Sequence, residues 1–427
     1  MGGPQPRACV VPASEDRPDA IAGSGSGGSS GGSDAAVPAA LLPADVAALL
    51  SRPRVSKPPD AAPVGAGGSP AAAASLTPDN LFFHRVVSVL TTITTPFQQL
   101  AVVDTGTYGR ALVLDGKIQT ATGDEAFYHE PLVHIPAVLF ATRPSAFVAD
   151  GNSSRSSNGD GSEWGLAGGL PASAPTSALV LGGGDGGSVR ELLRWPSMTA
   201  VTLVDIDGAV VDACRTHLRA IHGGALDGDP RVHVVIGDAI AFVADHHDTY
   251  DLILCDVTDP LEDGPSAALF TREFFATVGR LLAPGGVMAM QAGPSSLVEN
   301  PRLHPRVMRT LSSVFPHVAS FVSYIPTYGS PLGFGIASFT TPTDAPPARI
   351  TDTILASLTG PPLVAMDGAA LIGAFGIPAC LRRAIAAETV VYTTETPVDT
   401  LGASTGGNRE GSDVDDDRGG APQVTSH

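Results

Sequence analysis

The feature that most constrains the fold is a strand, a glycine loop and a helix in direct succession. An apolar run, residues 178–181 (ALVL), is followed by the glycine loop 182–187 (GGGDGG) and by the helix-like segment 188–194. A continuous apolar run is typical of a strand that is buried on both faces. Strand, glycine loop and helix in this order open a nucleotide-binding βαβ unit. The sequence therefore predicts a parallel sheet with a ligand site beside the glycine loop.

Further apolar strands follow at intervals that leave room for helices between them. They are residues 201–204, 232–236 and 252–255, and they end at Asp205, Asp238 and Asp256. Alternating strands and helices predict an α/β fold with a doubly wound, Rossmann-like parallel sheet. Ligands of such sheets bind in the crevice at the carboxyl ends of the strands. We therefore expect the three aspartates to lie at one crevice.

The rest of the chain divides by composition. Short strands between residues 81 and 120 and a helix from about Asp124 to Phe140 predict a small antiparallel β domain at the N-terminal side. Gly, Ser, Ala and Pro dominate both ends and one internal interval, where little can be buried to offset ordering entropy. Residues 350–400 have mixed helical and strand character and are expected to complete the sheet or cover its edge. The predicted divisions are a disordered arm (1–75), the β domain with its linking helix (76–140), a flexible inserted loop (141–176), the Rossmann-like catalytic domain (177–402) and a disordered acidic tail (403–427).

Composition excludes several classes of function. A net charge of −18 disfavours nucleic acids and anionic membranes as partners. The four cysteines have no spacing that indicates a disulfide framework or a zinc site, and no metal site is expected. No apolar run is long enough to span a membrane, and no secretory or organellar leader pattern is present, so we expect a cytoplasmic protein.

The glycine loop and the strand ends favour a nucleoside that lacks phosphates. The loop is not Gly-x-Gly-x-x-Gly and has no phosphate-binding Lys or Arg. Asp205 can accept hydrogen bonds from both ribose hydroxyls; the alternative is that it caps a helix before Ala209. Asp238 can accept from the adenine amine, and Ala239 can add a backbone N–H. An S-adenosylmethionine methyltransferase accounts for all of this equally well.

Three further segments distinguish the alternatives. They are residues 113–119 (VLDGKIQ), 124–130 (DEAFYHE) and 256–265 (DVTDPLEDGP). With the glycine loop, they closely resemble the polyamine aminopropyltransferases, the spermidine synthase family, over roughly residues 97–338. The resemblance implies a class I methyltransferase-type fold and transfer of an aminopropyl group from decarboxylated S-adenosylmethionine to a polyamine, with methylthioadenosine released. The donor is then a cosubstrate, no cofactor or metal is required, and a homodimer is expected.

The resemblance also implies roles for individual residues. Asp256 is the expected base, assisted by Asp259 and Tyr128, because an amine with a pKa of about 10 must lose a proton before it attacks. Asp185 can pair with the aminopropyl ammonium and would repel the carboxylate of intact S-adenosylmethionine. The expected donor-binding residues are Gln98, Gln119, Gly183, Asp185, Asp205, Asp238, Ala239 and Pro265; the expected polyamine-binding residues are His129, Asp185, Asp259 and Tyr328.

The acceptor is the least constrained feature. Asp205 in place of the family's usual Glu, the long loop 259–265 and the segment 291–294 (QAGP) resemble the thermospermine synthase branch, which implies spermidine as acceptor. The segment 325–328 (IPTY) is more similar to spermidine synthases, which use putrescine. A third alternative is an inactive regulatory relative, although Asp185, Asp256 and Gln119 are all present.

Overall fold

The computed structural model describes residues 71–77, 80–143, 166–167, 170–171, 174–260, 266–298 and 300–398, all within one compact unit, Leu41–His427. The predicted acidic tail, most of the N-terminal arm and most of the inserted loop lie outside these ranges. The folded part begins earlier than residue 76, because a strand starts at Ala71. The backbone of this strand pairs with the next strand, with Ala71 opposite Arg85.

The predicted N-terminal β domain closes into a barrel. Successive strands pair antiparallel, and the first pairs with the last in parallel, a closure that the sequence did not indicate. Asp115 and Gly116 form the tight turn before the last strand, both with positive φ (48° and 81°), which a type I′ hairpin requires. The strands are β1 (Ala71–Thr77), β2 (Asn80–Thr94), β3 (Gln99–Thr105), β4 (Gly109–Leu114) and β5 (Lys117–Ala121).

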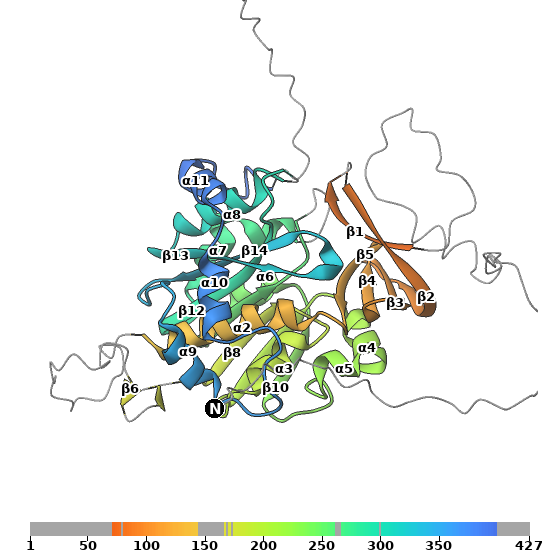
Figure 1. Cartoon of the computed structure of the whole chain (residues 1–427), viewed down its shortest axis with the longest axis horizontal. Coiled ribbons are helices and arrows are strands. Elements are labelled where there is room, and N and C mark those ends of the chain that lie inside the picture. Colours follow the sequence, from red (N-terminus) through yellow and green to blue (C-terminus); the bar gives the residue numbers. More distant parts are fainter. Residues whose placement is uncertain are drawn as a thin grey trace, which may run out of the picture. The chain divides into compact units, whose positions relative to one another are not determined.

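The second sheet has seven strands, in the order β10-β9-β8-β11-β12-β14-β13 (Figure 1). The first five are parallel, and β14 runs antiparallel to both of its neighbours. The strand order reverses between β8 and β11, where the register places Gly182 opposite Asp256. The predicted doubly wound α/β sheet is confirmed. Its strands are β8 (Ser177–Gly182), β9 (Ala200–Asp205), β10 (Val232–Ile236), β11 (Tyr250–Asp256), β12 (Leu282–Pro294), β13 (His317–Tyr324) and β14 (Pro331–Ser338); a further pair, β6 (Leu166–Ala167) and β7 (Leu170–Pro171), lies within the insertion.

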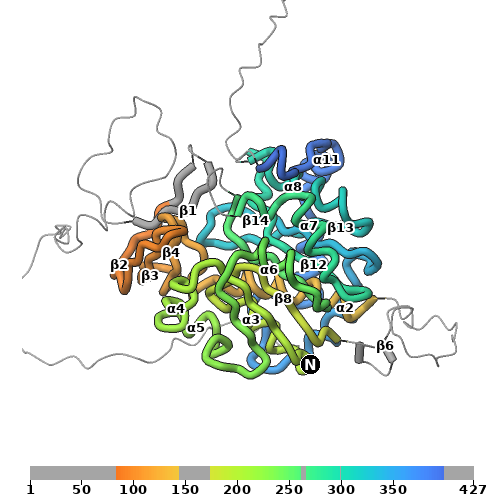
Figure 2. The backbone as a smooth tube through the Cα atoms, turned by 180° about the vertical axis from the view of Figure 1, so that it is seen from behind, coloured from red at the N-terminus to blue at the C-terminus, as the bar shows by residue number. Residues whose placement is uncertain are grey.

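Helices cover both faces of this sheet (Figures 1 and 2). Alternate residues of β8 enter two different cores: Ala178 and Val180 pack towards α2, whereas Leu179 and Leu181 pack towards α7 and α8. The helices are α2 (Ala126–Ala141), α3 (Gly187–Leu193), α4 (Gly208–His217), α5 (Arg219–His222), α6 (Ala239–Asp245), α7 (Arg272–Gly279), α8 (Leu303–Ser312), α9 (Ala348–Leu355), α10 (Gly368–Phe375) and α11 (Ala379–Ala387), with 3-10 turns η3 (Ala267–Phe270) and η4 (Pro326–Tyr328).

Helix α2 confirms the prediction of a helix from about Asp124 and is buried from Tyr128 to Ala141. Pro131 has no N–H to donate to the carbonyl of Phe127, four residues earlier. The hydroxyl of Ser323 donates to that carbonyl instead, at 2.6 Å. The helix can therefore carry a proline in its interior without leaving this carbonyl unpaired.

The C-terminal segment covers the molecule and does not extend the sheet. Helices α9, α10 and α11 pack on α2, β13 and α8 respectively. Residues 388–392 form no strand, although their composition is typical of one. Within the described ranges, no single helix is long and apolar enough to cross a membrane; α10 and α11, bent by 53° where they meet, reach that length and composition only as a pair.

The barrel contacts the catalytic domain through one face of β3 and β4. Val103 and Val113 point into the barrel core, whereas Leu100 and Leu112 pack against α4, on Val210 and its neighbours. This contact follows the alternation of side chains along a strand. It brings the hairpin of β4 and β5 to the carboxyl ends of β8 and β9, where the site lies.

Candidate active site

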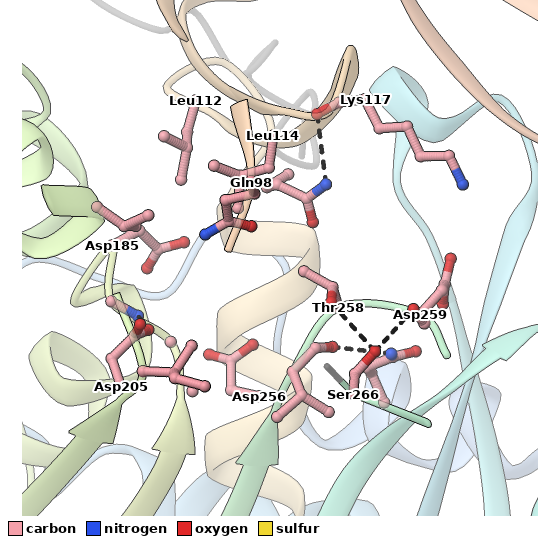
Figure 3. Close-up of a pocket in the computed structure, with 18 of the residues that line it drawn as sticks. Gln98, Leu112, Leu114, Lys117, Asp185, Asp205, Asp256, Thr258, Asp259 and Ser266 are labelled. Atoms are coloured by element: carbon pink, nitrogen blue, oxygen red, sulfur yellow. Dashed lines mark hydrogen bonds between the residues drawn. The ribbon is translucent and has the colours of Figure 1, made fainter. Parts of the chain in front are cut away.

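A cavity of about 240 Å³ lies where the barrel hairpin meets the carboxyl ends of β8, β9 and β11 (Figure 3). All but two of the predicted site residues line it. The exceptions are Pro265, which is outside the described residues, and His129, which lies behind the cavity wall. The predicted residues in the lining are Gln98, Gln119, Tyr128, Gly183, Asp185, Asp205, Asp238, Ala239, Asp256, Asp259 and Tyr328.

Asp205 is held at the end of β9 by two backbone donors. Its Oδ2 accepts the N–H of Gly184 at 2.9 Å, and its Oδ1 accepts that of Asp207 at 2.9 Å. Burial raises the pKa of Asp205 to about 6. The helix-cap alternative is wrong for Asp205, because Asp207 accepts the N–H of Ala209 and caps α4. Asp205 therefore stays available to the cavity.

The glycine loop permits close approach of carboxylates to the backbone. A Cβ at Gly184 would stand 2.6 Å from Oδ2 of Asp205, and one at Gly183 would stand 2.7 Å from Oδ2 of Asp256. Gly183 also has a φ of +70°. A side chain at either position would displace a carboxylate that the cavity needs.

Asp238 and Gln98 each have a structural contact beside their place in the cavity. Asp238 Oδ1 accepts the N–H of Ile240 at 2.9 Å and caps α6, in whose first turn Ala239 lies. The side-chain amide of Gln98 donates to Asp207 at 3.0 Å. These contacts fix the orientation of the two side chains before any ligand enters.

Asp256 ends β11, and both of its oxygens accept hydrogen bonds. The Tyr128 hydroxyl donates to Oδ1 at 2.7 Å, and the Ser188 hydroxyl donates to Oδ2 at 2.6 Å. Burial, together with the negative charge of Asp185, raises the pKa of Asp256. Sequence reasoning missed Ser188; its position directly after the glycine loop, at the start of α3, was the available signal.

Asp185 faces the cavity from the glycine loop (Figure 3). Its Oδ1 accepts the N–H of Gly187 at 2.8 Å and lies 3.4 Å from Nε2 of His129. Burial opposes ionisation, but the imidazole of His129, the N–H of Gly187 and the guanidinium of Arg190 together lower the pKa of Asp185. His129 itself is 1% exposed; it contacts Asp185 and does not line the cavity.

Asp259, Tyr328 and the barrel hairpin also line the cavity. Burial raises the pKa of Asp259, and the nearby ammonium of Lys117 opposes the rise. The Tyr328 hydroxyl donates to the carbonyl of Gln119. Gln291 braces the segment after β11: its amide donates to the carbonyl of Val257 at 2.8 Å and accepts the N–H of Gly293 at 2.8 Å.

Comparison with known proteins identifies the family. The family described as "Spermine/spermidine synthase domain" matches residues 165–344, and "Spermidine synthase tetramerisation domain" matches residues 75–122. A polyamine aminopropyltransferase of Synechococcus sp. is 42% identical over 324 residues, which cover 75% of this chain and 94% of that relative. The chain belongs to the spermidine synthase family. It is an aminopropyltransferase.

More distant relatives agree. The polyamine aminopropyltransferase of Aeropyrum pernix is 34% identical over 320 residues, covering 73% of this chain and 90% of the relative. A spermidine synthase solved in complex with the transition state analogue AdoDATO matches in fold with a TM-score of 0.61 and 23% identity, over 74% of this chain and 94% of that one. The spermidine synthase from Thermotoga maritima gives a TM-score of 0.60 at 22% identity, over the same shares of the two chains. The class I methyltransferase-type fold is thereby confirmed, and aminopropyl transfer replaces the methyltransferase alternative.

The charge of the cavity fits an aminopropyltransferase. Among the lining residues that the structure describes, Lys117 is the only cation. A wall with excess negative charge attracts cationic substrates and repels anionic phosphates. In the part of the chain that is described, no three His, Cys, Asp or Glu residues are grouped to hold a metal ion. The lining carboxylates are those of Asp115, Asp185, Asp205, Asp238, Asp256 and Asp259.

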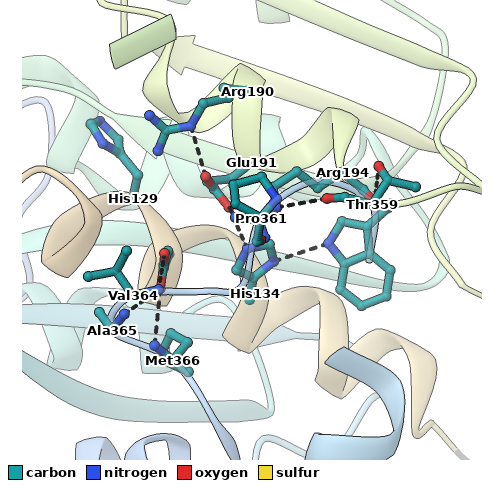
Figure 4. Close-up of polar contacts among 12 residues, drawn as sticks. His129, His134, Arg190, Glu191, Arg194, Thr359, Pro361, Val364, Ala365 and Met366 are labelled. Carbon is teal, nitrogen blue, oxygen red and sulfur yellow. Dashed lines mark hydrogen bonds and ion pairs between the residues drawn. The ribbon is translucent and has the colours of Figure 1, made fainter. Parts of the chain in front are cut away.

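A second polar cluster ties α2 to α3 and to the C-terminal segment (Figure 4). Nε2 of His134 lies 2.8 Å from Oε2 of Glu191, and the same oxygen accepts a hydrogen bond from Arg194 at 3.0 Å. The Glu130 carboxylate accepts three consecutive backbone N–H groups, from residues 364–366, at 2.7 to 3.0 Å. Sequence reasoning missed this cluster, because its members lie up to 236 positions apart.

Proposed function

We propose that this aminopropyltransferase is a thermospermine synthase that uses decarboxylated S-adenosylmethionine and spermidine. A primary amine of spermidine forms a bond to the propyl carbon next to the sulfonium. The bond from that carbon to sulfur breaks, its electrons stay on sulfur, and neutral methylthioadenosine leaves. The proton lost by the attacking amine goes to Asp256. The observation that carries the proposal is the placing of Asp185 and Asp256 in one cavity, where a cationic donor and a cationic acceptor can meet.

The donor is proposed to lie along the carboxyl ends of β8 and β9. Asp205 accepts from the ribose hydroxyls, and Asp238, Ala239 and Pro265 surround the adenine. Asp185 pairs with the aminopropyl ammonium, and its lowered pKa keeps it ionised for that purpose. The carboxylate of intact S-adenosylmethionine would meet the same charge and be repelled. Gln98, Gln119 and Gly183 complete the donor side. The donor is a cosubstrate, and no other cofactor is proposed.

Asp256 is proposed as the general base. An ordinary aspartate, with a pKa of about 4, is a weak base for an ammonium. The raised pKa of Asp256 reduces that mismatch, and Tyr128 and Ser188 fix its two oxygens. Asp259 and Tyr328, which also line the cavity, position the polyamine. The buried His129 is not proposed to touch the polyamine.

Spermidine as acceptor is supported by Asp205, by the long loop after Asp259 and by the segment that contains Gln291. Gln291 holds the carbonyl of Val257, so this segment shapes the loop that carries Asp259. Putrescine is the alternative acceptor, favoured by the segment 325–328, whose Tyr328 lines the cavity. The two acceptors differ by one aminopropyl unit and therefore in the length of polyamine that the cavity must hold.

The test is to incubate the full chain with decarboxylated S-adenosylmethionine and either spermidine or putrescine. Methylthioadenosine is measured, and the polyamines are resolved by chromatography that separates thermospermine from spermine. Thermospermine from spermidine is the expected result. Formation of spermine from spermidine would reject the thermospermine assignment. So would a product that forms with putrescine as acceptor and not with spermidine. Asp256→Asn is the matched control, because it keeps the shape of the side chain and removes the base.

We also propose a homodimer that works in the cytoplasm. The match of residues 75–122 to a tetramerisation domain supports an oligomer, and the buried, unpaired thiols of Cys214 and Cys255 suit a reducing compartment. Light scattering after gel filtration should give the mass of two chains. Four chains would replace the dimer, and a single chain would reject it. Cell fractionation tests the location.

A further inference from the structure

A largely buried series of ionic contacts ends at the carboxylate of Asp185, which lines the cavity. Arg190 donates to both oxygens of Glu125, each at 2.8 Å. Glu125 Oε2 lies 2.7 Å from Nδ1 of His129, and Nε2 of His129 lies 3.4 Å from Oδ1 of Asp185. Figure 4 labels two members of this series, Arg190 on α3 and His129 on α2. The contacts thus connect α3, α2 and the glycine loop.

The geometry favours an imidazolium at His129. Both ring nitrogens face carboxylates, which accept hydrogen bonds and do not donate them when ionised. Burial opposes ionisation of Glu125, but His129 and Arg190 together hold the pKa of Glu125 below its ordinary value. Burial also disfavours a charged ring, but Asp185 and Glu125 hold the pKa of His129 well above its ordinary value. Each ring nitrogen therefore carries a proton towards one carboxylate.

The imidazole ring of His129 occupies a space that is open because residue 187 is a glycine. A Cβ at Gly187 would come within 2.4 Å of Cε1 of His129, so only glycine leaves room for the imidazole. The N–H of the same glycine donates to Oδ1 of Asp185 at 2.8 Å. Gly187 and His129 therefore engage the same carboxylate oxygen. The second oxygen, Oδ2, is left to face the cavity.

We propose that His129 is a positioning residue: it fixes Asp185 so that Oδ2 receives the aminopropyl ammonium of the donor. The inference rests on the proposed donor and deepens it, and it differs from the expectation that His129 touches the polyamine. The charged or titratable groups facing the ring from the packed elements are Glu125, Tyr128, Asp185, Arg190 and Asp256.

Two amide variants separate the two ends of the ring. The amide nitrogen of His129→Gln can stand near the former Nε2 and still donate to Asp185. The amide nitrogen of His129→Asn can stand near the former Nδ1 and donates to Glu125 only. Equilibrium dissociation constants of both full-length variants are measured by calorimetry for decarboxylated S-adenosylmethionine and for methylthioadenosine. Methylthioadenosine lacks the aminopropyl ammonium, so it reports on the rest of the donor site.

The expected result is selective. His129→Asn weakens the binding of decarboxylated S-adenosylmethionine by about tenfold or more, the order expected when a charged hydrogen bond is lost. It leaves methylthioadenosine within about twofold, and His129→Gln retains most of the donor affinity. Equal weakening of both ligands, or no weakening of either, would overturn the proposal. So would a normal donor affinity combined with a raised KM for spermidine, because that outcome assigns His129 to the polyamine.

A second variant acts without touching the ring. Glu125→Gln removes the charge that holds the imidazolium from its other side. We expect it to weaken the binding of decarboxylated S-adenosylmethionine and to leave the binding of methylthioadenosine nearly unchanged. A variant in which the ratio of these two dissociation constants equals that of the wild type would contradict the proposal. If His129→Asn does not fold, this variant decides. Because the binding assay needs no turnover, its outcome is independent of whether spermidine or putrescine is the acceptor.

Discussion

The hydroxyl of Tyr128 donates a 2.7 Å hydrogen bond to Oδ1 of Asp256 across 128 residues of sequence. Tyr128 lies in the first turn of α2, and Asp256 is the last residue of β11. The bond therefore joins the helix that links the two domains to the strand end that carries the proposed base. Desolvation and the adjacent Asp256 keep the pKa of Tyr128 well above its ordinary value, so the hydroxyl remains a donor.

Replacement of the proposed base should affect the chemical step. We expect Asp256→Asn to lower kcat by about 10²-fold to 10⁴-fold, the range typical of a lost general base. The dissociation constant of methylthioadenosine should change by less than about threefold, because Asp256 acts on the amine. Steady-state kinetics and calorimetry measure the two quantities. A variant with more than about a tenth of the wild-type kcat would exclude Asp256 as the base.

Removal of the Tyr128 hydroxyl should have a smaller effect. Tyr128→Phe keeps the ring packing against Phe334 and His129 and leaves Ser188 as a donor to Asp256. The loss of one hydrogen bond to a charged group predicts a decrease in kcat of about tenfold to a hundredfold. Combining Tyr128→Phe with Asp256→Asn should add little to Asp256→Asn alone, because the two groups act as a unit. Fully multiplicative effects in the double variant would show that they do not.

Asp205 predicts a pH dependence of stability. Its folded-state pKa is about 6, against 3.8 for the ordinary side chain, so the folded protein retains this proton over a range in which the unfolded chain has lost it. The protonated Asp205 side chain therefore contributes fully to the free energy of unfolding below about pH 4. This contribution is lost as the pH rises through about 6, a change of up to about 3 kcal/mol. Asp205→Asn should therefore show a smaller change than wild type in the free energy of unfolding between pH 4 and pH 6. Parallel curves for the two proteins would show that Asp205 titrates normally.

The glycine loop offers a steric test with a matched control. Gly184→Ala would bring Cβ to 2.6 Å from Oδ2 of Asp205, so the carboxylate must move. We expect methylthioadenosine to bind at least about tenfold more weakly. Gly373→Ala, in α10, introduces its methyl group into open space and should leave that affinity unchanged. Equal affinities for the Gly184 variant and wild type would indicate that Asp205 does not contact the nucleoside.

Local patterns predicted the elements that are continuous in sequence. The apolar run before Gly182, the turn at Asp115 and the aspartates at the strand ends each depend on neighbouring residues, and each is found as expected. Barrel closure depends on pairing between Ala73 and Lys117, which no local pattern encodes. Composition likewise gave no sign that Ala71 lies in a strand.

Within the site, residue type predicted which side chains lie close together. It did not predict which of them line the cavity and which lie behind its wall. Asp185 and His129 were both expected to face substrate, but only Asp185 lines the cavity. The difference arises because Gly187 leaves a space behind the loop that an imidazole fills. Ser188 and Lys117 escaped notice because a serine after a glycine loop and a lysine in a hairpin are common features without chemistry of their own.

The carboxylate of Glu130 has a consequence for the design of shortened proteins. Two residues after Tyr128 on the same helix, it accepts the N–H groups of Val364, Ala365 and Met366. A fragment that stopped before residue 364 would keep the whole region that matches the synthase domain, which ends at residue 344, and would still leave this buried carboxylate without these three donors. The smallest active fragment should therefore extend beyond Met366. Its C-terminal limit is set by the contacts of Glu130 on α2 and not by the end of the region that matches the family.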